Sequence, residues 1–433
     1  MSETPSLPVA ARTWLTIGLL SFGGPAGQIA VMHRVIVEER RWVSEERFLR
    51  ALNLCTLLPG PEAQQLVTWL GWSQHGLVGG LVSGGLFVLP GALVMLGLSA
   101  AYAAWHTLPW MGGVFFGIKA AVLALVAEAL LRVGRRALVK PMDRAMTALS
   151  FLAIALLGAP YPAVVALAGL AGARWPERFG RPAASNEEGA PSTWPSWRRS
   201  LGLLVVGLLL WWAPVGALAA SLGPEHPFTR LGLFFSQAAV VTFGGAYAVL
   251  AYMAQHVVHD MGWLSAGQMV DGLGLAETTP GPLILVVQFV GFMTGFQRPA
   301  PLEPWSAGLF ASALVLWVTF VPSFLWIFVC APYVDAIGRS RRLRGALAAI
   351  TGAVVGVIAS LSLWFALHVC FRETTLVHLG WHELEVPVLK SADPVAILAA
   401  ALALVATFRW HVGLARLLGG AALLGALWGL LHG

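Results

Sequence analysis

The stretch Leu58-Pro59-Gly60-Pro61-Glu62 decides the fold, because its Pro-Gly-Pro core returns far downstream in Thr279-Pro280-Gly281-Pro282-Leu283. Two more motifs return at the same separation and in the same order: Phe22-Gly23-Gly24 as Phe243-Gly244-Gly245, and Trp42-Val43-Ser44 as Trp263-Leu264-Ser265. These three matching spacings predict two copies of one unit. Each copy carries two motifs that should interrupt a helix.

The composition is that of a membrane protein. Apolar residues make up 58% of the 433 residues and charged residues 11%, and the mean hydropathy is +0.75. A soluble domain carries about twice that charged fraction, and the length leaves room for roughly a dozen membrane segments. We therefore interpret the net charge of +6 as a sign of topology and not of nucleic-acid binding. The three cysteines lack metal-ligand spacing and no Walker A motif occurs, so we expect no metal, no cofactor and no ATP-driven transport.

Thirteen apolar segments follow one another along the chain, with a polar, proline-containing stretch between the sixth and the seventh. We place the segments at residues 10–32, 51–73, 77–104, 111–134, 144–158, 160–174, 201–222, 229–255, 269–295, 305–330, 345–371, 393–408 and 411–431. The polar stretch has the composition of a linker, and the segment after it has no partner in the other copy. The predicted domains are a first transporter repeat at 1–174, a cytoplasmic linker with a connecting helix at 175–228, and a second repeat at 229–433.

The distribution of charge predicts that the second copy is inverted in the membrane. Seven segments, an odd number, separate equivalent positions in the two copies. Loop 132–144 is rich in Arg and Lys, whereas its partner 372–390 carries acids and histidines; loop 104–110 has no Lys or Arg, whereas its partner 331–344 has four arginines. This change of sign is what inversion requires. The predicted fold is therefore an all-α polytopic membrane protein with two inverted-topology repeats of about six segments each, plus one linking helix.

One loop leaves two topologies open. Residues 34–50 contain five arginines, yet three segments separate them from the basic loop 132–144. The conflict disappears if the interrupted segments 10–32 and 51–73, and their counterparts in the second copy, are re-entrant hairpins. Full spans are the alternative, with the arginines of 34–50 offset by four glutamates. We favour the hairpins.

The interrupting motifs predict an anion site. Glycine frees the backbone, and a proline after it fits the first turn of a new helix. A broken helix exposes N–H groups and a positive dipole end, and inside a membrane this is tolerated only where protein or a water-filled cavity surrounds it. The alternative is a kink that only shapes packing. The predicted substrate-binding residues of the breaks are Phe22, Gly23, Gly24, Pro25, Pro59, Gly60, Pro61, Phe243, Gly244, Gly245, Pro280, Gly281 and Pro282.

Ionisable and polar side chains, inside apolar segments or beside the breaks, complete the predicted site. Lys119, inside an apolar segment, could pair with an anion or with a carboxylate. Glu277 would repel an anion unless protonated, as a proton-coupling group should, and Glu62 is either a second such group or a charge at a helix start. The predicted donors to the substrate, each of which could instead serve packing between helices, are Gln28, Gln65, Tyr247, Thr278 and Thr279.

These motifs resemble those of the chromate ion transporter family of bacterial membrane proteins, in its long, two-domain form. The resemblance rests on Phe22–Gln28, Leu58–Pro61 with Gln65, Phe243–Tyr247, Glu277–Pro282 and Gly291-Phe292. It excludes the linker 175–200 and the segment 201–222, and Thr351 stands where Lys119 aligns.

The resemblance implies a secondary transporter of the bacterial inner membrane that exports chromate, is driven by the proton motive force and confers chromate resistance. Its partners would be chromate or a sulfate-like oxyanion, protons and membrane lipid. The assembly is left open, with a homodimer as one option. The rivals are an importer of sulfate or another oxyanion, a membrane enzyme acting on a lipid, and a passive channel.

Overall fold

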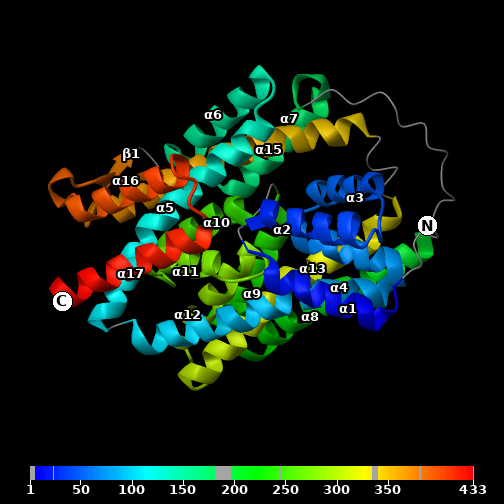
Figure 1. Cartoon of the computed structure of the whole chain (residues 1–433), viewed down its shortest axis with the longest axis horizontal. Helices are drawn as coiled ribbons and strands as arrows, with labels where there is room; N and C mark the ends of the chain where they lie inside the picture. Colours follow the sequence, from blue (N-terminus) through cyan, green and yellow to red (C-terminus); the bar gives the residue numbers. More distant parts are fainter. Residues whose placement is uncertain are drawn as a thin grey trace. The chain divides into compact units, whose positions relative to one another are not determined.

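The computed structural model describes residues 5–22, 24–106, 108–180, 197–243, 246–333, 340–379 and 382–432 (Figure 1). The described chain is helical apart from one β-hairpin, which confirms the prediction of an all-α polytopic membrane protein. Among the described residues, helices long and apolar enough to cross a membrane lie at Glu62–Trp105, Trp110–Ala137, Trp197–Leu222, Pro304–Tyr333, Arg341–Cys370 and Leu414–Leu431.

The chain forms two compact units, and each takes segments from both sequence copies. Residues 1–100, 183–246 and 279–340 form unit 1, and residues 101–182, 247–278 and 341–433 form unit 2. The predicted domains group residues by sequence copy, whereas these units group residues that pack together. The chain passes between the units inside α4, after residue 182, at the start of α10, after α11 and directly before α15.

Unit 1 contains most of the interrupted helices. Its elements are α1 (Leu7–Leu20), α2 (Gly24–His33), the π-helix η1 (Arg34–Glu39), α3 (Glu45–Leu57), α4 (Glu62–Trp105, whose last turn belongs to unit 2), α8 (Trp197–Leu222), α9 (Pro227–Val241), η4 (Leu283–Leu285), α12 (Val286–Gln297), α13 (Pro304–Cys330) and η5 (Ala331–Tyr333). Helix α13 packs against α8, α9 and α12, and residues 279–295 are buried throughout.

Unit 2 is built around the long helices α5 (Pro109–Ala137) and α15 (Arg341–Cys370). Helix α17 lies along α5, and α6 and α7 pack on α15 (Figure 1). The other bounds are α6 (Pro141–Ala155), α7 (Tyr161–Arg174), η2 (Pro176–Arg178), α10 (Ala246–Ala254), the π-helix η3 (Gln255–Asp260), α11 (Ala266–Thr278), β1 (Thr374–Leu379), β2 (His382–Pro387), η6 (Leu389–Ser391), α16 (Pro394–Phe408) and α17 (Leu414–His432).

The two copies share one order of elements at the predicted spacing. In each copy a helix ends, a second helix begins within a few residues and continues as a six-residue π-helix, and a third helix ends at the Pro-Gly-Pro motif. The π-helices η1 and η3 begin at Arg34 and Gln255, which are as far apart in the sequence as the two Pro-Gly-Pro motifs. The residues that follow them, Arg41 and Gly262, both have positive φ, at 52° and 55°. The structure therefore repeats the backbone as well as the motifs.

Helix lengths confirm that the predicted segments are interrupted. Helix α1 has 14 residues and α2 has 10, so at about 1.5 Å per residue neither alone reaches across a hydrocarbon core of about 30 Å. The predicted gap between 51–73 and 77–104 appears as non-helical backbone at His75 and Gly76 within α4.

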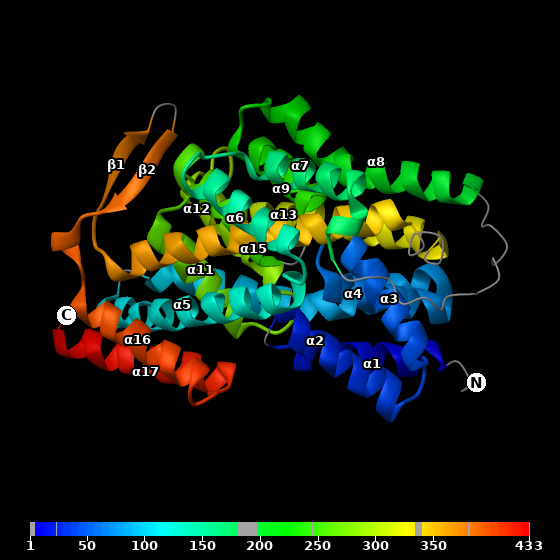
Figure 2. The same cartoon turned by 90° about the horizontal axis from the view of Figure 1, so that it is seen from above.

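The predicted loop 372–390 contains a β-hairpin, which the all-α prediction did not include. Strands β1 and β2 pair antiparallel, from Thr374 opposite Pro387 to Leu379 opposite His382 (Figure 2).

Candidate functional site

The four helix breaks lie in unit 1 and are joined by reciprocal backbone hydrogen bonds. The amide of Gly60 donates to the carbonyl of Thr242 at 2.7 Å, and the amide of Gly281 donates to the carbonyl of Ser21 at 2.8 Å. The two donors occupy equivalent positions in the two copies, and so do the two acceptors. Such an exchange of equivalent contacts is what a two-fold relation between copies produces. Each Pro-Gly-Pro break is thereby bonded to the first break of the other copy.

Glycine is required at both Pro-Gly-Pro breaks. Gly60 has φ of +133° and Gly281 has φ of +84°, a region that side chains disfavour. A Cβ at Gly60 would also lie 2.6 Å from Nε2 of Gln65. Helix α4 passes close to the second of these breaks, since a Cβ at Gly91 in α4 would meet the carbonyl oxygen of Pro280 at 2.1 Å.

The amide side chains predicted as donors to a ligand hold the breaks instead. Nε2 of Gln28 donates to the carbonyl of Gly281 at 2.6 Å, and Nε2 of Gln65 donates to the carbonyl of Pro59 at 2.8 Å. The hydroxyl of Thr278 donates to the carbonyl of Leu275 at 2.7 Å, so this side chain also has a protein acceptor. A ligand would have to displace these bonds or use other donors.

The remaining predicted residues of the breaks differ in accessibility. Phe22 is 46% exposed, whereas Thr279, Pro280, Gly281 and Pro282 are buried. Gly24, which begins α2 with φ of +74°, and Pro61 are buried as well, while Pro25, Pro59, Glu62 and Phe243 are partly buried. Gly23, Gly244 and Gly245 lie outside the described residues.

Unit 2 contains the predicted carboxylate in an enclosed setting. Glu277 in α11 is 5% exposed and accepts a hydrogen bond of 2.6 Å from the hydroxyl of Tyr247 in α10. Arg132 of α5 acts on Glu277 electrostatically and forms an ion pair with Glu128 one turn away. Tyr247 and Glu277 were assigned separate roles from the sequence, and the structure brings them into contact.

A second buried carboxylate in α11 was missed by the sequence analysis. Oδ1 of Asp271 lies 3.2 Å from Nζ of Lys119 in α5, and Oδ2 accepts a hydrogen bond of 2.9 Å from the hydroxyl of Tyr102. The side chain of Asp271 is 7% exposed and that of Lys119 is 27% exposed. The signal was present, because an aspartate within the apolar run Met269-Val270-Asp271-Gly272-Leu273 is a functional candidate by default.

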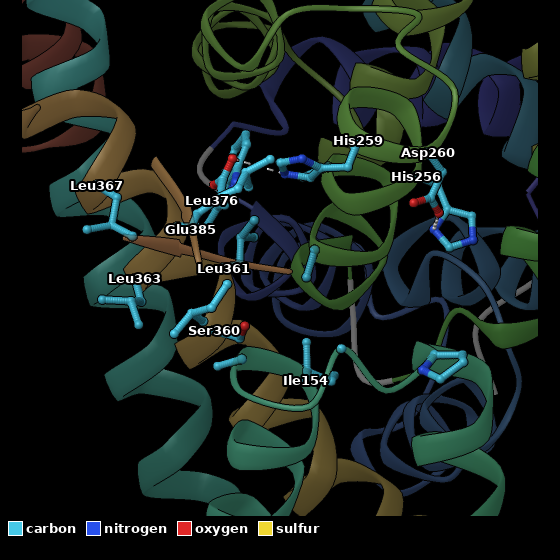
Figure 3. Close-up of a pocket in the computed structure, with 17 residues that line it drawn as sticks. Ile154, His256, His259, Asp260, Ser360, Leu361, Leu363, Leu367, Leu376 and Glu385 are labelled. Atoms are coloured by element: carbon cyan, nitrogen blue, oxygen red, sulfur yellow. Dashed lines mark ion pairs between the residues drawn. The ribbon is translucent and has the colours of Figure 1, made fainter. Parts of the chain in front are cut away.

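Unit 2 also contains an open pocket of about 670 Å³, lined by the end of α6 and the loop after it, α10, η3, α15 and the β-hairpin (Figure 3). Leucines form much of its wall, and His259 and Glu385 point toward one another across it, with 3.8 Å between Nε2 and Oε1. Glu385 also lies 3.6 Å from Nε2 of His368. Within the described part of the chain, no group of three or more His, Cys, Asp or Glu is arranged to hold a metal ion.

A polytopic membrane protein whose two copies each carry two interrupted helices has the architecture of a membrane transporter. The chain belongs to the chromate transporter family, since that family's profile matches residues 9–173 and 229–426. The unmatched residues between these ranges include the linker and the whole of α8.

Several proteins of known name are similar over most of their length. A probable chromate transport protein of Synechococcus elongatus is 30% identical over 82% of this chain and 84% of its own. Chromate transport proteins of Cupriavidus metallidurans and Pseudomonas aeruginosa are 28% and 31% identical, over 93% and 83% of this chain and 93% and 80% of their own. No solved structure matches the chain.

Proposed function

We propose that this protein is a secondary active transporter that exports chromate from the cytoplasm across the inner membrane of a bacterium, with coupling to protons, and so confers chromate resistance. Membership of the family and the names of the relatives support chromate as the substrate. The observation that carries the proposal is the reciprocal bonding of Gly60 to Thr242 and of Gly281 to Ser21. In transporters with inverted repeats, interrupted helices meet in this way around a central substrate site.

The anion would bind at the helix starts that follow the breaks. The first-turn N–H groups of a helix lack intrahelical acceptors, and the helix dipole there favours an anion. Helix α2 begins at Gly24 and α4 begins at Glu62, each directly after a break. Since the amides of Gly60 and Gly281 already donate to carbonyls, these two bonds fix the breaks in position, and the first-turn amides of α2 and α4 receive the oxyanion.

Two charged side chains complete the proposed mechanism. Lys119, in unit 2, is proposed to pair with the dianion at one stage of transport. Glu277, enclosed and hydrogen-bonded to Tyr247, takes up and releases a proton as the site opens alternately to the two sides of the membrane. Glu62, at the first turn of α4, is a second candidate for proton exchange. In this proposal the two copies are inverted relative to the bilayer. The state open to the cytoplasm and the state open to the outside then have equivalent backbone structures.

Everted membrane vesicles test this function directly, because export from the cell becomes uptake into the vesicle. Chromate uptake is measured with a pH gradient and a membrane potential imposed separately, in the presence and absence of excess sulfate. We expect uptake that responds to the imposed pH gradient and that is lost in Lys119→Met. Uptake that responds to the membrane potential but not to the pH gradient would indicate a channel that passes the anion passively. Uptake of sulfate without chromate would indicate a transporter for another oxyanion.

A further inference from the structure

Lys119 is paired with a carboxylate that the sequence analysis did not consider. The ion pair of Lys119 with Asp271 joins α5 to α11, and the hydroxyl of Tyr102 fixes the second carboxylate oxygen. The carboxylate is buried, whereas Lys119 keeps about a quarter of its side chain exposed. Gly267 lies near the ammonium group without a side chain, since a Cβ there would be 3.5 Å from Nζ. Lys119 is therefore the more exposed member of the pair.

A dianion that reaches Lys119 would place a second negative group beside Asp271. A buried charge without a partner is costly in a low-dielectric interior, and one ammonium group cannot fully neutralise both a carboxylate and a dianion. The cost is removed if the carboxylate becomes neutral as the dianion arrives. Protonation does this without a change in the position of Tyr102, whose oxygen can accept a hydrogen bond from a carboxylic acid.

We infer that Asp271 is the internal counter-ion of Lys119, and that the oxyanion and one proton displace this pairing together. This inference rests on the proposed function and names the residue that links anion binding to proton binding. The balance is simple: the Asp271 carboxylate and one proton give the carboxylic acid, while Lys119 stays an ammonium ion and pairs with the anion instead. The site changes from neutral to one net negative charge, so that one chromate and one proton carry a single negative charge outward, down an inside-negative potential.

Few titratable or charged groups face Asp271 in the described chain. Lys119 of α5, Tyr102 of α4 and His106 just after α4 face it. The other charged groups nearby on these helices, Glu128 and Arg132 of α5, act on Glu277 instead. On α15, which also packs on α11, the charged residues lie at the ends, at Arg341, Arg342, Arg344 and His368. Lys119 is thus the neighbour whose charge the Asp271 carboxylate balances.

The test is the number of protons taken up when the purified full-length protein binds chromate, measured by titration calorimetry in buffers of different ionisation enthalpy. The alkaline range is used, where free chromate stays a dianion. The wild-type protein should take up about one proton per anion, so its affinity should rise by about tenfold for each unit of decreasing pH. Asp271→Asn should bind chromate at least as tightly with no proton uptake, and Lys119→Met should lose binding. Asp260→Asn, a carboxylate paired with His256, should behave as the wild type.

Other outcomes of this titration would contradict the inference, the proposed substrate or both. Proton uptake that persists in Asp271→Asn, or binding that weakens as much as in Lys119→Met, would overturn the inference and leave Asp271 with a structural role. If Asp271→Asn does not fold, Tyr102→Phe replaces it. Loss of the hydrogen bond makes the carboxylate easier to protonate, so the rise in chromate affinity with falling pH should begin at a more alkaline pH. An unchanged pH profile would contradict the inference. Protein that binds sulfate but not chromate, with Asp271-dependent proton uptake, would refute the proposed substrate and retain the inference. Protein that binds no tetrahedral oxyanion would refute both.

Discussion

The hydroxyl of Tyr247 donates a hydrogen bond of 2.6 Å to the carboxylate of Glu277, joining α10 to α11 in unit 2. Both residues belong to the second sequence copy. At the spacing that separates the two Pro-Gly-Pro motifs, their equivalents in the first copy are Ala26 and Thr56. The backbone of the protein is therefore duplicated, whereas this buried acid is not. Glu277 is therefore a candidate position for proton exchange that has no counterpart at the equivalent position of the first copy.

Removal of this acid should uncouple transport from protons. Glu277→Gln should keep chromate binding and lose the acceleration of uptake by an imposed pH gradient. Tyr247→Phe removes a hydrogen bond to a charged group, which contributes about 1.5–3 kcal/mol, and should reduce the rate on the order of tenfold. Vesicle uptake with and without the gradient measures both. The exposed carboxylate of Glu373 provides the control, and Glu277→Gln with full gradient dependence would exclude the assigned role.

The glycines at the Pro-Gly-Pro breaks should not tolerate a side chain. Gly60→Ala and Gly281→Ala each place a Cβ on backbone with positive φ, at a cost of about 1–2 kcal/mol, and the first also meets Gln65. We expect a lower Tm and loss of chromate uptake in both. Gly97→Ala in α4 is the matched control, because a Cβ there has open space and alanine favours a helix. Equal losses of Tm and of chromate uptake at all three positions would contradict a specific requirement for glycine at the breaks.

Stability at acidic pH should depend on Asp393, which caps the start of α16 and lies outside the helices long enough to cross a membrane. Burial raises its pKa, but the hydrogen bonds from Arg372 and from the amides of Ala396 and Val395 outweigh burial, so that its pKa lies below the ordinary value of 3.8. A lowered pKa in the folded state stabilises the protein above the unfolded pKa, and this stabilisation is lost as pH falls toward the folded value.

The expected result is a Tm that falls below about pH 4, with a shallower fall in Asp393→Asn. Asparagine still caps α16, so Asp393→Ala should lose about 1 kcal/mol more at neutral pH. Thermal unfolding followed at several pH values measures both effects. A Tm for Asp393→Asn that follows the wild-type curve throughout would show that the ion pair with Arg372 contributes nothing.

Thiol labelling should decide between hairpins and full spans. If the interrupted segments are re-entrant, loop 34–50 lies on the cytoplasmic side together with loop 132–144. A cysteine introduced at Glu46, whose side chain is 80% exposed, should then react only from the cytoplasmic side, as should one at Arg136. Cysteine at Glu373 should react from outside. The native cysteines are first replaced by alanine, and labelling at position 46 from outside would favour full spans.

Much of the fold could be predicted because glycine, proline and hydropathy mark helix ends in the sequence. The breaks at Gly60 and Gly281 and most helix bounds were found in this way. The π-helices were missed because hydrogen bonds from residue i to i+5 have no clear sequence signature, and residues 34–39 were assigned to a loop. The hairpin had a weak signal, the alternation in Glu383-Leu384-Glu385-Val386.

The site was harder to predict than the fold, because a sequence does not reveal pairings over long separations. Lys119 was recognised, but its partner Asp271 belongs to the other sequence copy and its second neighbour, Tyr102, is on another helix. The donor roles assigned to Gln28 and Gln65 also depend on which carbonyls lie nearby. Such contacts follow from packing, which composition and spacing do not determine.

The exchanged bonds of Gly60 and Gly281 have a consequence for assembly. Each half of the polypeptide supplies the acceptor that closes the other half's Pro-Gly-Pro corner, so neither half is structurally self-sufficient. Two separately synthesised fragments, 1–180 and 197–433, should co-purify and restore uptake when produced together, and each should be degraded when produced alone. Transport would then require that the two halves pack together, but not that they are joined in one polypeptide.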